Sequence, residues 1–232
     1  MAYVITAPEQ AVVAVAGSGD HFPVGRIYCV GRNYAEHARE MGHDPDREPP
    51  FFFQKHAGAL LAAAEPAGGD FPYPSMTSDV HHEIELVVAM KLGGTDIKAA
   101  DALGHVWGYA VGIDMTRRDV QGEAKKLGRP WDGGKSFDNA APVSLLHPAS
   151  EVGHPAAGAI WLDVNGTRRQ EGDLNQLIWS VPEIIEHLSA LFGLQAGDLI
   201  MTGTPAGVAA VGPGDELTGG VEGLAGIMVR VV

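Results

Sequence analysis

Short apolar runs separated by glycine and proline are the dominant pattern of this 232-residue chain. Seven such runs are rich in Val, Ile and Leu and have the length of a strand. They cover residues 11–17, 27–31, 83–90, 108–114, 159–166, 198–203 and 226–232. The 31 glycines and 15 prolines imply many turns and few long helices. We therefore predict an α+β fold in which strands dominate.

One helix is clearly indicated, from Ser180 to Phe192. Ser180 and Glu183 form a capping box, Pro182 lies in the first turn, and Gly193 follows as a stop signal. Shorter helices are predicted at residues 34–41, 97–103 and 116–127. Strands do not alternate regularly with long helices, which disfavours a doubly wound parallel sheet.

Neither an internal repeat nor a linker divides the chain. We predict a small N-terminal extension at residues 1–23 and a single catalytic domain at residues 24–232. Hydrophobic residues make up 45% of the sequence, as expected for a compact globular protein rather than a disordered one.

The charge balance and the cysteine content exclude several classes of protein. A net charge of −13 argues against nucleic-acid binding, because phosphate contacts need clustered Lys and Arg. No apolar run approaches the roughly 20 residues that span a bilayer, and the N-terminus lacks the basic region of a signal peptide. We expect a cytoplasmic protein. The single cysteine, Cys29, allows no intrachain disulfide, so any metal must bind to oxygen or nitrogen ligands.

Three acidic residues stand at the ends of apolar runs. Glu83 and Glu85 are two residues apart in "HHEIELVVAM", so in a strand both carboxylates leave the same face. Asp114 ends the apolar run "GYAVGID". Like charges beside an apolar strand are costly unless a cation neutralises them, and Mg²⁺, Mn²⁺ and Ca²⁺ prefer carboxylate oxygens. The spacing equally allows an edge strand with both glutamates in water, and Asp114 can instead cap a helix.

Other residues suggest acid–base or substrate-binding roles. His37 and Glu40 are three residues apart, so on a helix they share a face, and a carboxylate beside an imidazole supports a general base. Lys135 in "GGKSFD" adjoins glycines that let a ligand approach closely, and in the turn "TGTPAGV" the Thr204 hydroxyl or the backbone amides could hold a carboxylate. Each also has an ordinary explanation as a surface or loop residue.

Six segments taken in order resemble the fumarylacetoacetate hydrolase family. They are "CVGRNYAEHAREM", "PFFFQK", "HHEIEL", "GYAVGIDMTRRDVQ", "GRPWDGGKSFDNAAPV" and "GDLIMTGTPAGV", and they cover nearly all of residues 24–232. Within the family the chain is most similar to bacterial fumarylpyruvate hydrolases. The resemblance implies a mixed β-roll or sandwich with a few short helices, and a homodimer built on it.

The resemblance also implies a role for each candidate residue. Glu83, Glu85 and Asp114 match the ligands of Mg²⁺ or Mn²⁺, His37 matches the residue that activates water, and Glu40 matches its carboxylate partner. Arg118, Gln121 and Lys135 match positions that contact the substrate and stabilise negative charge, and Thr204 matches a threonine near the substrate carboxylate. One departure is His56, which follows Lys55 where many relatives have proline.

The implied reaction is metal-dependent hydrolysis of a carbon–carbon bond in a 2,4-diketo acid. With fumarylpyruvate, an intermediate of aromatic-acid catabolism, the products would be fumarate and pyruvate. The alternative within enzymes is decarboxylation of oxaloacetate, or a related tautomerase reaction, on the same metal site. A non-catalytic cation-binding β-module would need only the carboxylates. Arg118, Lys135 and the metal would attract a small anionic substrate despite the net charge of −13.

Overall fold

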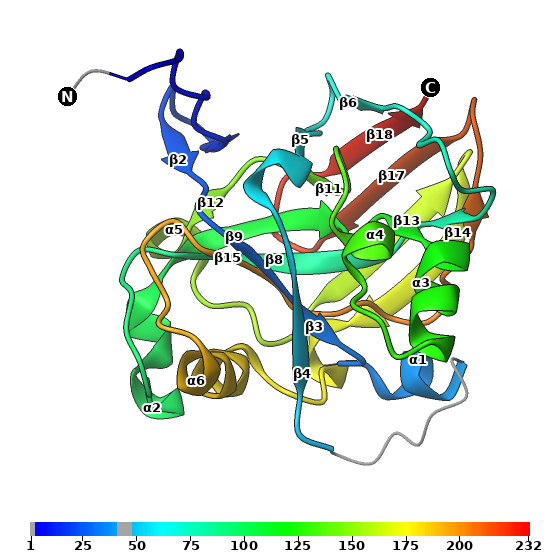
Figure 1. Ribbon diagram of the computed structural model, residues 1–232. Coiled ribbons are helices and arrows are strands. Elements are labelled where there is room, and N and C mark those ends of the chain that lie inside the picture. The colour runs from blue at the N-terminus through cyan, green and yellow to red at the C-terminus, as the bar shows by residue number, and fades with distance from the viewer. Residues whose placement is uncertain (1–2, 41–47) are drawn as a thin grey trace.

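The computed structural model describes residues 3–40 and 48–232 and consists mainly of two β-sheets. The larger sheet has eight strands (Figure 1). Seven of them follow the order β4 (Phe51–Lys55), β3 (Ile27–Gly31), β15 (Leu199–Met201), β8 (Ile84–Met90), β9 (Val106–Ile113), β11 (Ala141–Val143) and β5 (Leu60–Ala62), and β12 (His147–Pro148) pairs with β9. The predicted strand-dominated architecture is confirmed.

The second sheet has five strands and crosses behind β8 and β9 in Figure 1. Its order is β14 (Thr167–Asp173), β13 (Ala159–Val164), β17 (Glu216–Val221), β18 (Ile227–Val231) and β6 (Gly69–Phe71). A three-stranded sheet contains β10 (Thr116–Arg117), β7 (Val80–His81) and β16 (Ala210–Val211). Most pairs are antiparallel, but β15 with β3, β11 with β5, and β18 with β6 are parallel, so the large sheets are mixed.

The helices are short and lie around the sheets. They are α1 (Ala35–Glu40), α2 (Ala99–Ala102), α3 (Arg118–Lys126), α4 (Asp132–Lys135), α5 (Ala149–Val152) and α6 (Val181–Leu191), with 3-10 turns at Ala57–Ala59, Leu103–His105 and Leu174–Gln176. In Figure 1, α3 and α4 lie on one side of the sheets, and α2 and α6 on the other. No helix among the described residues is long and apolar enough to cross a membrane.

Each predicted helix is present in the described part of the chain, and Met41, the predicted end of the first, lies outside that part. Helix α6 has the expected capping box, in which the backbone N–H of Ser180 donates to Glu183 Oε2 at 2.9 Å. The helix predicted at residues 116–127 begins only at Arg118, because Thr116 and Arg117 pair with β7 as strand β10. The segment predicted at residues 97–103 is α2 followed by a 3-10 turn.

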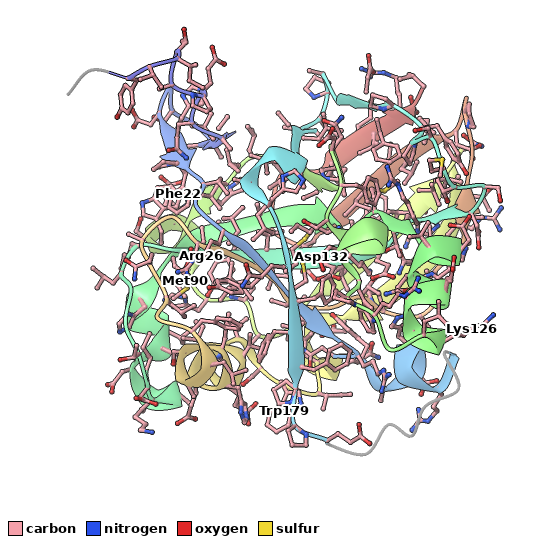
Figure 2. The ribbon with its side chains drawn as sticks, viewed as in Figure 1. Phe22, Arg26, Met90, Lys126, Asp132 and Trp179 are labelled. Carbon is pink, nitrogen blue, oxygen red and sulfur yellow. The ribbon has the colours of Figure 1, made fainter. Side chains whose placement is uncertain are left out.

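The N-terminal residues add a small hairpin to the larger body. Strands β1 (Val12–Ala14) and β2 (His21–Pro23) pair with each other. Phe22, labelled in Figure 2, is buried, and its ring centroid lies 5.7 Å from that of Trp107. The division into an extension and a catalytic domain stays a prediction.

Strand β8 lies at the centre of the core. Every residue from Ile84 to Met90 is buried, because β8 is flanked by β15 and β9 and faces the five-stranded sheet. Gly219 of β17 is so close that a Cβ there would lie 3.0 Å from Ile84 Cδ1. Polar groups at the start of β8 are thus withdrawn from water and need partners inside the protein.

Candidate active site

Three buried carboxylates converge where β8 begins and β9 ends. Glu83 precedes β8, Glu85 lies on it, and Asp114 follows β9. Antiparallel pairing places Asp114 opposite Glu83, and the Asp114 N–H donates to the Glu83 carbonyl at 2.8 Å. One oxygen from each side chain lies within 4.8 Å of the others. The alternative in which the glutamates face water does not hold, since Glu83 is 6% and Glu85 is 2% exposed.

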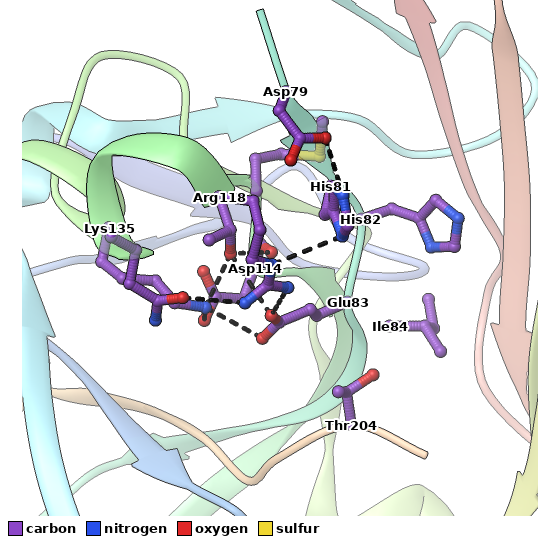
Figure 3. A network of polar contacts seen from close by, with 12 residues as sticks. Asp79, His81, His82, Glu83, Ile84, Asp114, Arg118, Lys135 and Thr204 are labelled. Atoms are coloured by element: carbon purple, nitrogen blue, oxygen red, sulfur yellow. Dashed lines mark hydrogen bonds and ion pairs between the residues drawn. The ribbon is translucent and has the colours of Figure 1, made fainter. Parts of the chain in front are cut away.

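Two cationic side chains contact these carboxylates on one side. Lys135, at the end of α4, is buried, and its Nζ donates to Glu83 Oε2 at 2.9 Å, Asp114 Oδ2 at 2.7 Å and Thr116 Oγ1 at 2.6 Å. Arg118, at the start of α3, donates to Glu83 Oε1 at 2.5 Å. Figure 3 shows both side chains directed at Glu83. The site therefore places positive charge beside two of the three carboxylates.

Lys55 is a third cation at the site, fully buried, which the sequence pattern did not predict. Its Nζ lies 2.7 Å from Asp114 Oδ1 and also donates to the carbonyl oxygens of Met115 and Lys135. A signal was present, because Phe51, Phe53 and Lys55 alternate along β4 and so share one face. Phe51 and Phe53 line the pocket described below.

The two glutamates have opposite electrostatic environments. Burial alone would raise the pKa of Glu83, but Lys135 and Arg118 hold it well below its ordinary value. Burial raises the pKa of Glu85 well above its ordinary value, and the charges of Asp114 and Glu83 raise it further. Its described hydrogen-bond donor is the backbone N–H of Gly203, at 2.6 Å. The negative charge of Glu85 is disfavoured by burial and by the neighbouring carboxylates. A hard divalent cation bound to the three carboxylate oxygens would balance it.

A pocket opens onto the carboxylates. The candidate residues that line it are His37, Glu83, Glu85, Arg118, Gln121, Lys135 and Thr204. Asp114 lies behind them, fully buried. The side chain of Glu40, the predicted partner of His37, lies outside the part of the chain that the structure describes. Apart from that pairing, the structure brings the candidate residues into one site.

An aromatic wall faces the charged side of the pocket. Trp131 lies between Phe51 and Phe53, with ring centroids 5.5 Å and 5.9 Å away. Lys135 Nζ lies 5.1 Å from the centroid of Phe53. The sequence pattern did not predict this wall. It gives one side of the pocket an apolar surface, which strengthens the electrostatic interactions beside it.

Arg118 is held in place by a chain of polar contacts. Asp79 Oδ1 lies 2.8 Å from His81 Nε2, and Arg118 Nε donates to His81 Nδ1 at 3.3 Å (Figure 3). Arg118 also donates to Gln121 Oε1 at 2.9 Å. Because His81 accepts from Arg118 at Nδ1, its hydrogen is on Nε2, directed to Asp79. These contacts fix the guanidinium beside Glu83.

The turn from Gly203 to Gly207 places Thr204 at the pocket. Gly203 has φ +99°, and a Cβ there would lie 2.7 Å from Asn33 Cβ, so only glycine fits. Asn33 donates to the Thr202 carbonyl at 2.8 Å and so fixes the residue that leads into the turn. This arrangement aims the Gly203 N–H at Glu85.

The fold agrees with comparisons to known proteins. Residues 26–232 match the family described as "Fumarylacetoacetate (FAA) hydrolase C-terminal". The chain belongs to the fumarylacetoacetate hydrolase family. The expected family fold, a strand-rich body with a few short helices, is confirmed.

Members of this family with different activities are similar to the chain. The crystal structure of fumarylpyruvate hydrolase from Pseudomonas aeruginosa, in complex with Mn²⁺ and pyruvate, is 52% identical and has a TM-score of 0.97, covering 100% of this chain and 99% of that one. Mitochondrial oxaloacetate tautomerase FAHD1 from Rattus norvegicus is 42% identical over 88% of this chain and 90% of its own. Mitochondrial oxaloacetate decarboxylase from Dictyostelium discoideum is 39% identical over 86% of this chain and 89% of its own.

Proposed function

We propose that this member of the fumarylacetoacetate hydrolase family hydrolyses a carbon–carbon bond in an acylpyruvate, with fumarylpyruvate as the substrate. One observation carries the proposal: a single pocket combines a buried acidic triad, a buried lysine and a histidine. The similar hydrolase from Pseudomonas aeruginosa contains pyruvate, which is a product of this reaction. The other product would be fumarate.

The pocket can bind both ends of the 2-oxo acid group. Glu83, Glu85 and Asp114 would hold Mg²⁺ or Mn²⁺, which supplies Lewis-acid polarisation of the neighbouring carbonyl when bound. Thr204 also lines the pocket and would donate to the substrate carboxylate. Arg118 and Gln121, which bond to each other, would contact the remaining oxygens.

Lys135 is suited to stabilising negative charge rather than to accepting a proton. Burial would lower its pKa, but Asp114 and Glu83 together raise it above the ordinary value. The ammonium therefore stays charged at neutral pH. When the carbon–carbon bond breaks, its electron pair passes to the departing pyruvate enolate, and Lys135 with Arg118 would stabilise that charge. The enolate then takes up a proton to give pyruvate.

His37 is proposed as the general base. It is buried and lines the pocket together with Glu83 and Arg118. It would take a proton from a water molecule whose oxygen attacks the distal carbonyl carbon, and Glu40 would orient its imidazole. The oxygen from water ends in the carboxylate of the released acid. The individual residue roles, the place in aromatic-acid catabolism, the cytoplasmic location and the homodimer remain proposals.

A second function, oxaloacetate tautomerisation or decarboxylation, is favoured by the curated relatives. The relatives at 42% and 39% identity act on oxaloacetate. Both reactions pass through an enolate of a 2-oxo acid, so the same acidic triad, Lys135 and Arg118 would serve them. Neither requires a water molecule activated by His37.

An assay of both substrate classes tests the proposal. The purified protein would be supplied with Mg²⁺ or Mn²⁺ and offered fumarylpyruvate, other acylpyruvates and oxaloacetate, with pyruvate release and keto–enol conversion followed separately. We expect the highest kcat/KM with fumarylpyruvate. Turnover of oxaloacetate with no release of pyruvate from any acylpyruvate would favour the second function.

A further inference from the structure

Gln170 is a fully buried polar residue that joins the strand of the acidic triad to the Thr204 turn. It lies on β14, in the five-stranded sheet, and none of the roles above involves it. Its Oε1 accepts from the Ile84 N–H at 3.1 Å, and its Nε2 donates to the Pro205 carbonyl at 2.9 Å. A backbone N–H can only donate and a carbonyl can only accept, so these partners fix the orientation of the amide.

This orientation determines where the Thr204 hydroxyl hydrogen can go. The second hydrogen of Gln170 Nε2 is donated to Thr204 Oγ1, at 2.8 Å. Thr204 therefore accepts from Gln170, and its own hydrogen is directed to a different acceptor. Because Thr204 lines the pocket, an anionic group bound there can be that acceptor.

The remaining bonding capacity of Gln170 is also used. Its Oε1 lies 2.8 Å from His82 Nδ1, which must carry a hydrogen because Oε1 only accepts. Figure 3 shows the His82 ring directed away from Glu83, on the opposite side from His81. All four hydrogen-bonding positions of the amide are then occupied, so the side chain cannot reverse without losing several buried bonds.

A close backbone contact brings the turn to Gln170. Gly207 has φ +95°, and a Cβ there would lie 2.0 Å from the carbonyl oxygen of Arg169, next to Gln170. Only glycine allows the turn to lie directly on β14. The pairing of Gln170 with Thr204 is thus fixed by the backbone as well as by the side chains.

We infer that Gln170 is a positioning residue that orients the Thr204 hydroxyl to donate to the carboxylate of the bound 2-oxo acid. The inference rests on the proposed function of Thr204. Gln170 itself is separated from the ligand and acts only through Thr204. Loss of the Gln170 Nε2 donor would weaken binding of the ligand carboxylate and leave the acidic triad in place.

The test measures pyruvate affinity of the Mn²⁺-loaded protein by calorimetry, which needs no turnover. Thr204→Val removes the hydroxyl. Gln170→Glu replaces the Nε2 donor with an acceptor, so Thr204 would donate to position 170 instead of to the ligand. We expect each variant to bind pyruvate about tenfold more weakly, the worth of one hydrogen bond to a charged group. The double variant should lose no more than the Thr204→Val protein.

Two further variants separate positioning from a general loss of stability. Gln170→Met removes the donor without burying a charge, and serves if the glutamate variant does not fold. Ser189→Ala removes a different buried bond, to the Ile97 N–H, on α6. We expect Gln170→Met to weaken pyruvate binding and to raise KM more than it lowers kcat. Ser189→Ala should change neither pyruvate binding nor these kinetic constants. Mn²⁺ affinity should be the same in all folded variants.

The outcomes distinguish this inference from the proposed function. Weakened pyruvate binding in Thr204→Val but unchanged binding in both Gln170 variants would overturn the role of Gln170 alone. Unchanged binding in Thr204→Val would overturn the role of Thr204 and the inference with it. The Gln170 change could also weaken pyruvate binding as much in the Thr204→Val protein as in the wild type. Gln170 would then act independently of Thr204, which also contradicts the inference.

Discussion

Lys55 and Asp114 form an ion pair of 2.7 Å in which neither side chain reaches solvent. The Lys55→Met variant would leave Asp114 with one cation fewer and the carbonyl oxygens of Met115 and Lys135 with one donor fewer. We expect the free energy of unfolding to fall by about 2–3 kcal/mol, because Asp114 Oδ1 loses its buried partner while Lys135 still pairs with Oδ2. Urea unfolding would measure this.

Arg168 provides the control for the lysine variant. It pairs with Asp163 at 2.5 Å but is 43% exposed, so Arg168→Met should cost less than about 1 kcal/mol. Equal unfolding free energies for the two variants would contradict the importance of the buried pair.

Gly207→Ala tests the close contact between the Thr204 turn and β14. Gly214 has nearly the same backbone angle, φ +94° against +95°, but no atom lies within 4 Å of a Cβ placed there. Gly214→Ala should therefore cost only the backbone strain, about 1–2 kcal/mol. Gly207→Ala adds a clash with the Arg169 carbonyl and should cost at least about 1 kcal/mol more. Gly207→Ala should also weaken pyruvate binding, and Gly214→Ala should not. Equal loss of pyruvate binding in both variants would contradict a specific role for the contact between Gly207 and β14.

His37→Ala separates the two candidate reactions. Loss of a general base should lower kcat for acylpyruvate hydrolysis by about 100-fold or more. Mn²⁺ affinity and any conversion of oxaloacetate should persist, because neither needs an activated water. The exposed His21 gives the control, and His21→Ala should leave both activities unchanged. Normal hydrolysis by the His37→Ala protein would mean that another group is the base.

Much of the site could be predicted from the sequence because it depends on local periodicity. The two-residue spacing of Glu83 and Glu85 places both on one strand face, and an acidic residue at the end of the next apolar run pairs with them in an antiparallel sheet. The capping box of α6 is local in the same sense. These features need only a few neighbouring residues to be defined.

The residues that were missed become significant only through distant contacts. Lys55 reaches Asp114 across 59 positions of the chain, and Gln170 reaches Thr204 across 34. β14 is the polar segment "TRRQEGD", which lacks the apolar pattern of a strand, so neither the strand nor its buried glutamine was predicted. Pairing with β13 determines that strand, and such tertiary pairing overrides local propensity.

The most direct test of the shared metal site is a calorimetric titration of Glu85→Gln with Mn²⁺. Glu85 is the most suitable of the three carboxylates, because its described donor is the Gly203 N–H, which an amide oxygen can still accept. We predict one Mn²⁺ per wild-type chain and affinity at least about tenfold weaker in Glu85→Gln, with the partly exposed control Glu186→Gln unchanged. Undiminished Mn²⁺ affinity in a folded Glu85→Gln protein would contradict a metal site made by Glu83, Glu85 and Asp114.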